Sequence, residues 1–307
     1  MSKMAEAVAA YLELRRGLGF KLGRPGQLLG QFARYCDDAG AEIVTNDLAP
    51  TWARQPATAR PSWWSARLSA VRPFARYLHG FDPRHEVPPR EVLPRGPHRA
   101  EPFIYSPSDL AALLHAAGRL RQRLASPTIT TYIGLLAVTG MRAGEAIRLD
   151  REDIDMDEGL LVVRNSKFGK SRELMLHPST VLALRDYDKH RSRLTQSRTG
   201  AFFVSPLGTR LEYNNVQRVF HRLTKVAGLQ PRSDTCRPRL HDLRHTFAVS
   251  TIMDWYRAGY DVGQRMHLLT TYLGHTQPGH TYWYLSATPE LLAFVGQRLA
   301  AQLGDLA

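Results

Sequence analysis

The 307-residue sequence predicts a mainly α-helical protein with one small antiparallel β-sheet, an α+β fold in two domains. Apolar residues recur at helical spacing through residues 1–87 and through most of the chain after the predicted sheet. A proline-rich stretch separates residues 1–87 from residues 104–307. Three short β-forming runs, separated by turn residues, lie within the second part and predict the sheet.

Residues 1–87 are predicted to form a helical bundle. The apolar spacing from Val8 to Leu18 predicts a first helix, and a second is expected over 25–39. A third begins at Thr45 with a cap-like sequence, and a fourth begins at Pro61. Either the basic residues here form a face against the DNA backbone, or the tryptophans are core and the arginines are solvated. The candidate DNA contacts are Lys21, Arg60, Arg67, Arg72 and Arg76.

Residues 88–103 are rich in proline and arginine. Proline at this density excludes the interiors of helices and strands, which predicts an extended linker between the domains. Arg95 and Arg99 are candidate DNA contacts in this linker, because its basic residues could follow the duplex.

Residues 104–307 begin with the capped helix start Ser106-Pro107. A buried helix over 127–138 ends at Thr139-Gly140, and a short helix with Arg142 and Glu145 follows. Strands are expected around Ile154, over 160–163 and over 174–176, with Lys167 in the second turn. Further helices are expected at 178–194, 213–227, 240–258, 262–273, 279–286 and 289–302.

The charge balance points to a polyanionic partner. The chain has 41 Lys and Arg against 28 Asp and Glu, a formal charge of +13, which suits nucleic acid but also a solubilising surface. The cysteines Cys36 and Cys236 are too few for a disulfide framework and lack metal-site spacing, which favours a reducing, cytoplasmic location. No apolar run approaches the roughly 20 residues that span a bilayer, so no membrane association is expected.

Two short motifs carry the first candidate catalytic residues. Arg142 precedes Glu145 by three residues, so the arginine could reach a phosphate while the glutamate holds its guanidinium from behind. His241 and Arg244 lie one helical turn apart and could both reach one anionic group. His241 and His245 also have the spacing of zinc ligands. The metalloprotease pattern needs a glutamate after the first histidine, where this chain has aspartate, so we expect no metal and expect His245 to pack inward.

A Leu-Gly-His sequence ending at His275 follows an apolar helix, and Tyr284 comes nine residues later. With these residues the chain resembles the tyrosine recombinase, or phage-type integrase, family. The family's catalytic domain carries Thr-Gly-x-Arg-x-x-Glu, a β-hairpin Lys, His-x-x-Arg, Leu-Gly-His and a nucleophilic Tyr, in this order. The resemblance covers about residues 104–290, and residues 1–87 fit the family's core-binding domain in size and class. The segment 282–290 is similar to integrases of mobile elements.

The resemblance implies that Arg142 and Arg244 hold the scissile phosphate and that Lys167 protonates the leaving 5′ oxygen. It implies that His241 assists as a proton acceptor or phosphate donor, that His275 hydrogen-bonds the phosphate and that Glu145 supports the site. Tyr284 would form a 3′-phosphotyrosine, and no metal, ATP or other cofactor is required. Tyr282 is a rival nucleophile, but about 200° of helix rotation prevents both phenols from facing one phosphate. Lys170 rivals Lys167, and Lys170 and Arg172 are otherwise candidate DNA contacts.

The implied function is site-specific recombination of double-stranded DNA. A type IB topoisomerase, which would relax DNA with the same chemistry, and a non-catalytic DNA-binding protein are the alternatives. Apolar residues from Leu291 to Leu303 are spaced as one helix face, which predicts a tail helix. The resemblance implies that this helix docks on a neighbouring subunit of a homotetramer on DNA, with accessory recombinases as further possible partners.

Overall fold

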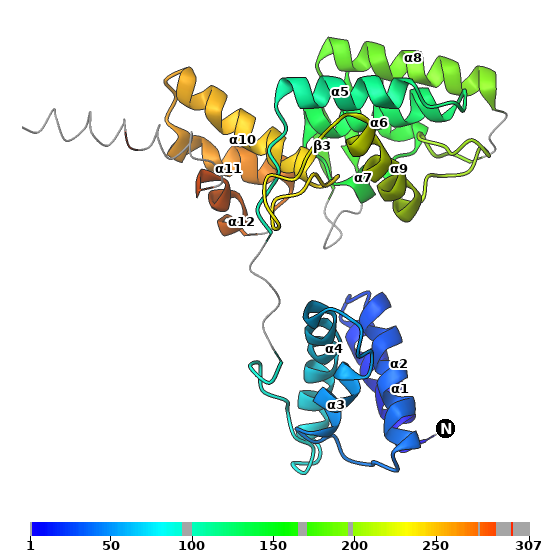
Figure 1. Cartoon of the computed structure of the whole chain (residues 1–307), viewed down its shortest axis with the longest axis vertical. Coiled ribbons are helices and arrows are strands. Elements are labelled where there is room, and N and C mark those ends of the chain that lie inside the picture. The colour runs from blue at the N-terminus through cyan, green and yellow to red at the C-terminus, as the bar shows by residue number, and fades with distance from the viewer. Residues whose placement is uncertain are drawn as a thin grey trace, which may run out of the picture. The chain divides into compact units, whose positions relative to one another are not determined.

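The structure is a computed structural model of the chain and describes residues 2–93, 100–164, 171–195, 199–275, 277–286 and Gly296. The chain divides into two compact units, Met1–Arg99 and Ala100–Ala307 (Figure 1). Several sequence-based expectations lie outside the described residues: Lys167, Lys170, Arg95, Arg99 and the helix expected at 289–302.

The first unit is helical. It contains α1 (Lys3–Gly17), α2 (Gly23–Asp38), α3 (Leu48–Arg54) and α4 (Pro61–His79). The four helices bury one apolar core, in which Phe32, Trp52 and Phe74 are almost inaccessible to solvent. The third helix begins at Leu48 and not at Thr45. Thr45 lies before the helix, and its hydroxyl accepts the Leu48 N–H at 3.1 Å.

The two ends of the expected linker pack against the units. Arg72 of α4 donates from Nε to the Pro88 carbonyl at 3.0 Å and from Nη2 to the Pro89 carbonyl at 2.9 Å. Leu93 is buried in the core of the first unit, and Phe103 is buried in the core of the second. Both ends of the predicted linker, 88–103, therefore contact one of the units.

The second unit combines helices with a small sheet. Its helices are α5 (Pro107–Gly118), α6 (Ala125–Thr139), α7 (Ala143–Arg148), α8 (Pro178–Leu194), α9 (Tyr213–Val226), α10 (Asp242–Arg257), α11 (Val262–Leu273) and α12 (Gly279–Tyr282), with the 3₁₀ turns η1 (Arg151–Asp153) and η3 (Trp283–Ser286). Its strands are β1 (Ile154–Asp155), β2 (Leu160–Val163) and β3 (Arg172–Met175). In Figure 1, α10, α11 and α12 lie together at one end of this unit. Among the described residues, no helix has both the length and the apolar character needed to cross a bilayer.

Helix α6 runs through the core of the second unit and sets the position of α7. Tyr132 of α6 is fully buried, and its hydroxyl donates to the Ala143 carbonyl at 2.9 Å. The helix ends at Thr139, and its C-cap residue, Gly140, has φ +59°. A Cβ at this position would lie 2.4 Å from the Phe247 ring, so both the backbone conformation and the close packing require glycine. Arg142 follows at the N-cap of α7.

The sheet has the order β1-β2-β3, and both strand pairs are antiparallel, as predicted. Leu161 pairs with Leu174, and Val163 pairs with Arg172. Because side chains alternate along a strand, Arg172 lies on the same face as the buried Leu174, the face turned toward the core. Its guanidinium is therefore directed toward α7 and α11.

Candidate active site

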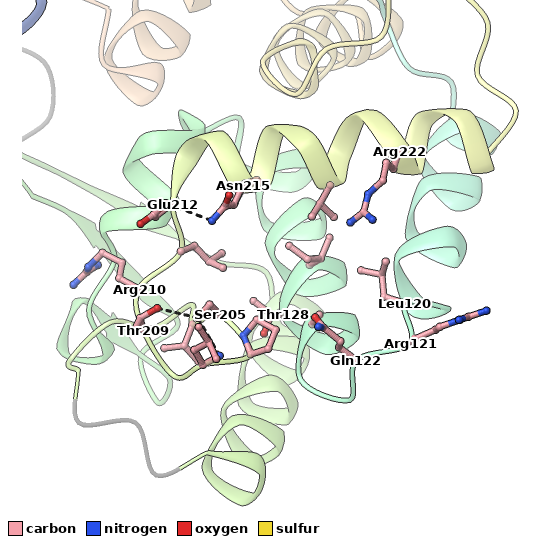
Figure 2. Close-up of a pocket in the computed structure, with 18 residues that line it drawn as sticks. Leu120, Arg121, Gln122, Thr128, Ser205, Thr209, Arg210, Glu212, Asn215 and Arg222 are labelled. Atoms are coloured by element: carbon pink, nitrogen blue, oxygen red, sulfur yellow. Dashed lines mark hydrogen bonds between the residues drawn. The ribbon is translucent and has the colours of Figure 1, made fainter.

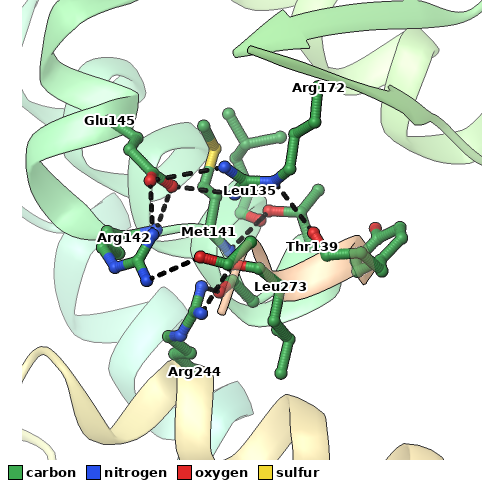
Figure 3. Close-up of polar contacts among 11 residues, drawn as sticks. Leu135, Thr139, Met141, Arg142, Glu145, Arg172, Arg244 and Leu273 are labelled. Carbon is green, nitrogen blue, oxygen red and sulfur yellow. Dashed lines mark hydrogen bonds and ion pairs between the residues drawn. The ribbon is translucent and has the colours of Figure 1, made fainter. Parts of the chain in front are cut away.

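The carboxyl end of α11 brings three guanidinium groups together. Arg172 Nε donates to the carbonyl of residue 272 at 2.8 Å, Arg244 Nη2 to that of residue 273 at 2.7 Å, and Arg142 Nη2 to that of residue 274 at 3.2 Å. The last carbonyls of a helix have no partner within the helix and form the negative end of its dipole, so they attract cations. Figure 3 shows Arg142, Arg172 and Arg244 converging here from three elements.

A buried carboxylate links two of these arginines. Glu145 accepts from Arg142 Nη1 at 2.8 Å and from Arg172 Nη2 at 2.9 Å, and it also accepts the backbone N–H of Arg142 (Figure 3). Burial by itself raises the pKa of Glu145, but the hydrogen bonds and charges of the two arginines outweigh it and lower this pKa to about 2. Glu145 therefore stays ionised and fixes both guanidinium planes.

Arg244, on the first turn of α10, lies at the centre of the cluster. Its side chain is only 2% exposed, and Nη1 donates to the Gly140 carbonyl at 2.8 Å. Burial and the positive charge of Arg142 lower the pKa of Arg244 to about 10, so it remains protonated at neutral pH. A phosphate placed beside Arg142 and Arg244 would relieve the repulsion between two like charges.

The start of α10 is fixed by a second ion pair with a buried carboxylate. Asp242 is completely buried and accepts from Arg239 Nε at 2.9 Å and Nη2 at 2.8 Å. His241, at the N-cap, is exposed to solvent. Its ring centroid lies 4.9 Å from that of His245, which places both histidines beside Arg244 at the same helix end. His245 packs inward, as its position in the sequence predicts.

His275 directly follows the C-cap of α11. The cap residue Gly274 has φ +68°, and a Cβ there would lie 3.1 Å from Arg172 Nη1, so glycine allows the guanidinium to pass. Burial and the charges of Arg244 and Arg142 lower the pKa of His275 to about 3. At neutral pH the imidazole is uncharged and has one N–H to donate.

Tyr284 lies in η3 within the same cluster. The phenol is 2% exposed, and its Oη is 3.2 Å from His245 Nδ1. Its ring stacks on the His275 ring, with 6.2 Å between the ring centroids and 22° between the ring planes. Tyr282 has a different environment, since it is 48% exposed. Of the two rival tyrosines, the structure thus places Tyr284 beside the arginines and histidines.

The structure brings together five of the six predicted catalytic residues: Arg142, His241, Arg244, His275 and Tyr284. The sixth, Lys167, lies outside the described residues. Sequence reasoning missed the contact of His245 with the Tyr284 hydroxyl, because it depends on how η3 folds back onto α10. Among the described residues, no group of three or more His, Cys, Asp or Glu side chains could hold a metal ion.

Some candidate DNA contacts occupy positions that disagree with that role. Arg67 is 7% exposed, stacks on the Trp52 ring and donates to the Trp52 carbonyl at 2.9 Å, so it belongs to the core of the first unit. The side chain of Arg172 is 12% exposed and is bonded to Glu145 and α11, which makes it part of the site's support. Arg72 is half-buried, and its guanidinium donates hydrogen bonds to the Pro88 and Pro89 carbonyls. Three candidates on the first unit are exposed: Lys21, Arg60 and Arg76.

A pocket of about 720 Å³ lies apart from this cluster, between the α5–α6 connection, residues 204–212 and α9 (Figure 2). None of the predicted catalytic residues lines it. One of its arginines, Arg210, is paired with Asp150 and donates to the Ile147 carbonyl. The pocket therefore supplies no group to the cluster of arginines and histidines around Tyr284.

Sequence comparisons with known proteins all point to integrases and recombinases. A family model described as "Phage integrase family" matches residues 106–290. A Sinorhizobium fredii protein described as an integrase/recombinase, y4rB, is 41% identical over 99% of both chains. A second from the same organism, y4rE, is 36% identical over 96% of this chain and 95% of its own.

Solved structures show the same fold. The Tn1549 transposon integrase in complex with transposon right end DNA has a TM-score of 0.67 at 16% identity, over 96% of this chain and 99% of that chain. A lambda integrase dimer bound to a COC′ core site has a TM-score of 0.62 at 17% identity, over 89% of this chain and 95% of that chain. Together with the sequence matches, this shows that the chain belongs to the phage integrase family, the tyrosine recombinases.

Proposed function

We propose that this site-specific recombinase cleaves and rejoins double-stranded DNA with Tyr284 as its nucleophile and Arg142, Arg244 and His275 as its phosphate-binding groups. The observation that carries the proposal is the position of Tyr284, buried beside Arg244 and stacked on His275. Fixed donors around a reacting phosphate usually supply the largest single contribution to lowering the barrier.

The proposed reaction is a transfer of the phosphate from one oxygen to another. The Tyr284 oxygen attacks phosphorus, the bond from phosphorus to the 5′ oxygen breaks, and a 3′-phosphotyrosine and a free 5′ hydroxyl remain. His241 accepts the phenol proton, and Lys167 donates a proton to the leaving oxygen. Arg142 and Arg244 bind the non-bridging oxygens, where negative charge builds up. Since Tyr284 is 2% exposed, η3 must move to present its oxygen to DNA.

The helical unit is proposed to act as a DNA clamp. Lys21, Arg60 and Arg76 are exposed and suited to phosphate contacts, which position the protein without reading the sequence. The set of proposed DNA contacts also includes three residues chosen from the sequence alone: Arg95, Arg99 and Lys170. Arg67 is left out, because its guanidinium is used inside the unit. A cytoplasmic location, where the protein would meet DNA, remains part of the proposal.

The proposed active form is a homotetramer on DNA, with accessory recombinases as further partners. Residues 287–307 would dock in trans through apolar positions that share one face of the expected helix: Leu291, Leu292, Phe294, Val295, Leu299 and Leu303.

Removal of the tail tests this assembly. A chain that ends at Ala287 keeps Tyr284 and is expected to bind a single site on DNA but to form few paired-site complexes. Gel-shift and light-scattering measurements on two-site DNA separate these two steps. Paired complexes at the full-length level would show that the tail is not the connector.

Covalent capture tests the proposed chemistry. The protein is mixed, with EDTA present, with nicked duplexes taken from DNA on either side of its gene. We expect an SDS-resistant adduct on a 3′ phosphate, a free 5′ hydroxyl that polynucleotide kinase can label, and joined products from two duplexes. Cleavage that requires a divalent metal, or attachment to a 5′ end, would contradict the proposal. Relaxation of plasmid without joined products would favour a topoisomerase.

A further inference from the structure

Asp242 is a completely buried residue that directly follows His241, and the proposed reaction gives it no role. Its backbone N–H donates to the Arg239 carbonyl at 3.0 Å. In return, its Oδ2 accepts the Arg239 backbone N–H at 3.1 Å. These two bonds close a turn over residues 239–242, and His241 lies inside this turn.

The carboxylate of Asp242 holds the turn through further donors. Arg239 donates to it from Nε at 2.9 Å and from Nη2 at 2.8 Å, and the Phe103 N–H donates to it as well. Hydrogen bonds between charged groups are roughly twice as strong as those between neutral groups. A buried carboxylate depends on such donors, because water does not reach it to replace them. The side chain of Asp242 therefore fixes the conformation of the turn.

The chain just before α5 also bonds to this turn. Arg239 Nη2 donates to the Glu101 carbonyl at 3.0 Å, and the Tyr105 hydroxyl donates to the Arg239 carbonyl at 2.9 Å. The Tyr105 N–H donates to the Thr246 hydroxyl, which itself donates to the Asp242 carbonyl, both at 2.9 Å. The turn therefore cannot shift without breaking bonds to a second part of the chain.

A displacement of the turn would affect His241 and Arg244 differently. The Arg244 guanidinium donates to the carbonyls of Gly140 and Leu273, so two other elements hold it in place. His241 is exposed at the N-cap of α10, and its backbone belongs to the turn itself. A displacement of the turn therefore moves the His241 imidazole directly.

We propose that Asp242 is a positioning residue, whose carboxylate closes the turn and so places the His241 imidazole to accept the Tyr284 proton. This rests on the proposed role of His241 as the proton acceptor. Asparagine has nearly the same shape as aspartate, but its amide has only one acceptor oxygen and cannot bind both donors of the Arg239 fork. Asp242→Asn should therefore loosen the turn without changing the volume of the side chain.

A double-mutant cycle tests whether Asp242 acts through His241. In single turnovers on nicked DNA, Asp242→Asn should cleave roughly 10-fold more slowly with unchanged DNA affinity, since a 1 Å misplacement of a reacting group can cost roughly 100-fold. In a His241→Ala background the same substitution should cost less than about 2-fold, because the displaced imidazole is already missing. An equal loss in both backgrounds, or a wild-type rate for Asp242→Asn, would overturn the proposal.

Two further variants separate positioning from stability. Asp153→Asn is the matched control, because Asp153 is also a buried carboxylate paired with an arginine, but it lies in η1. Its folded form should cleave at the wild-type rate, and slowing equal to that of Asp242→Asn would contradict the proposal. Arg239→Lys keeps the charge that compensates Asp242 but loses the fork. It should slow cleavage, and this effect should disappear in the His241→Ala background.

Amide hydrogen exchange of the DNA-free protein tests the turn without any reaction. The N–H groups of Arg239 and Phe103 both donate to the Asp242 carboxylate. Relative to the amides of β2 and β3, Asp242→Asn should speed their exchange by roughly 10-fold, as expected when charged hydrogen bonds are weakened. Unchanged exchange at both amides would overturn the proposal. A wild-type protein that cleaves no DNA would instead reject the proposed function, while the exchange rates would still show whether Asp242 closes the turn.

Discussion

Tyr284→Phe is expected to abolish the covalent protein–DNA adduct. The substitution removes the only atom proposed to attack phosphorus and keeps the ring that stacks on His275. No other group is proposed to replace the phenol oxygen, so the expected loss is complete within detection. Gel electrophoresis in SDS with labelled nicked DNA measures the adduct.

The matched control for this variant is Tyr282→Phe. Tyr282 carries the same hydroxyl two residues earlier but is largely exposed, so its variant should form adduct at the wild-type level. Both variants should bind DNA with wild-type affinity and unfold within about 1 kcal/mol of wild type, since each loses one hydroxyl. Adduct formation by Tyr284→Phe would remove Tyr284 from the nucleophile's role.

Glu145→Gln is expected to lower the free energy of unfolding by about 3 kcal/mol, because it leaves Arg142 and Arg172 close together without their shared anion. Cleavage should fall as well, since the Arg142 guanidinium loses the group that orients it. Thermal and urea unfolding measure the first effect. The control is Glu173→Gln, at an exposed position on β3 next to Arg172, and it should change stability by less than about 0.5 kcal/mol.

The contribution of Glu145 to the free energy of unfolding should decrease as the pH falls. Its pKa in the folded chain is about 2, against 4.5 for the unperturbed group, so the folded state favours the ionised carboxylate. The stabilisation is therefore fully present above about pH 4.5 and is lost as the pH falls toward 2. The difference in unfolding free energy between wild type and Glu145→Gln should shrink over this range. A difference that is constant from pH 7 to pH 3 would show that the carboxylate charge is not its source.

Local sequence patterns predicted most of the fold. Helical spacing, caps and turn residues indicated the helices of both units and the antiparallel sheet, because these signals depend on neighbouring residues. The start of α3 was placed too early, since the helix begins at Leu48 and Thr45 lies before it. The burial of Leu93 and Phe103, within the predicted linker, could not be predicted from a local pattern because it depends on tertiary packing.

The site was predicted in part. The spacing of Arg142 and Glu145 predicted their ion pair, which is present. Arg172 was assigned to DNA, although its place two residues before the buried Leu174 already indicated an inward-facing side chain. The contacts of His245 with Tyr284 and of Thr281 with His275 could not be predicted, because they join elements whose relative placement no local pattern contains.

The central claim is that the Tyr284 oxygen becomes covalently bound to a 3′ phosphate of DNA. Mass spectrometry of the trapped adduct, after nuclease and trypsin digestion, tests it most directly. Trypsin releases residues 266–298 as one peptide that contains Tyr272, Tyr282 and Tyr284, so fragment ions must locate the added nucleotide. The account predicts the added mass on Tyr284 alone. A nucleotide on Tyr282, on Tyr272 or on a different peptide would contradict it.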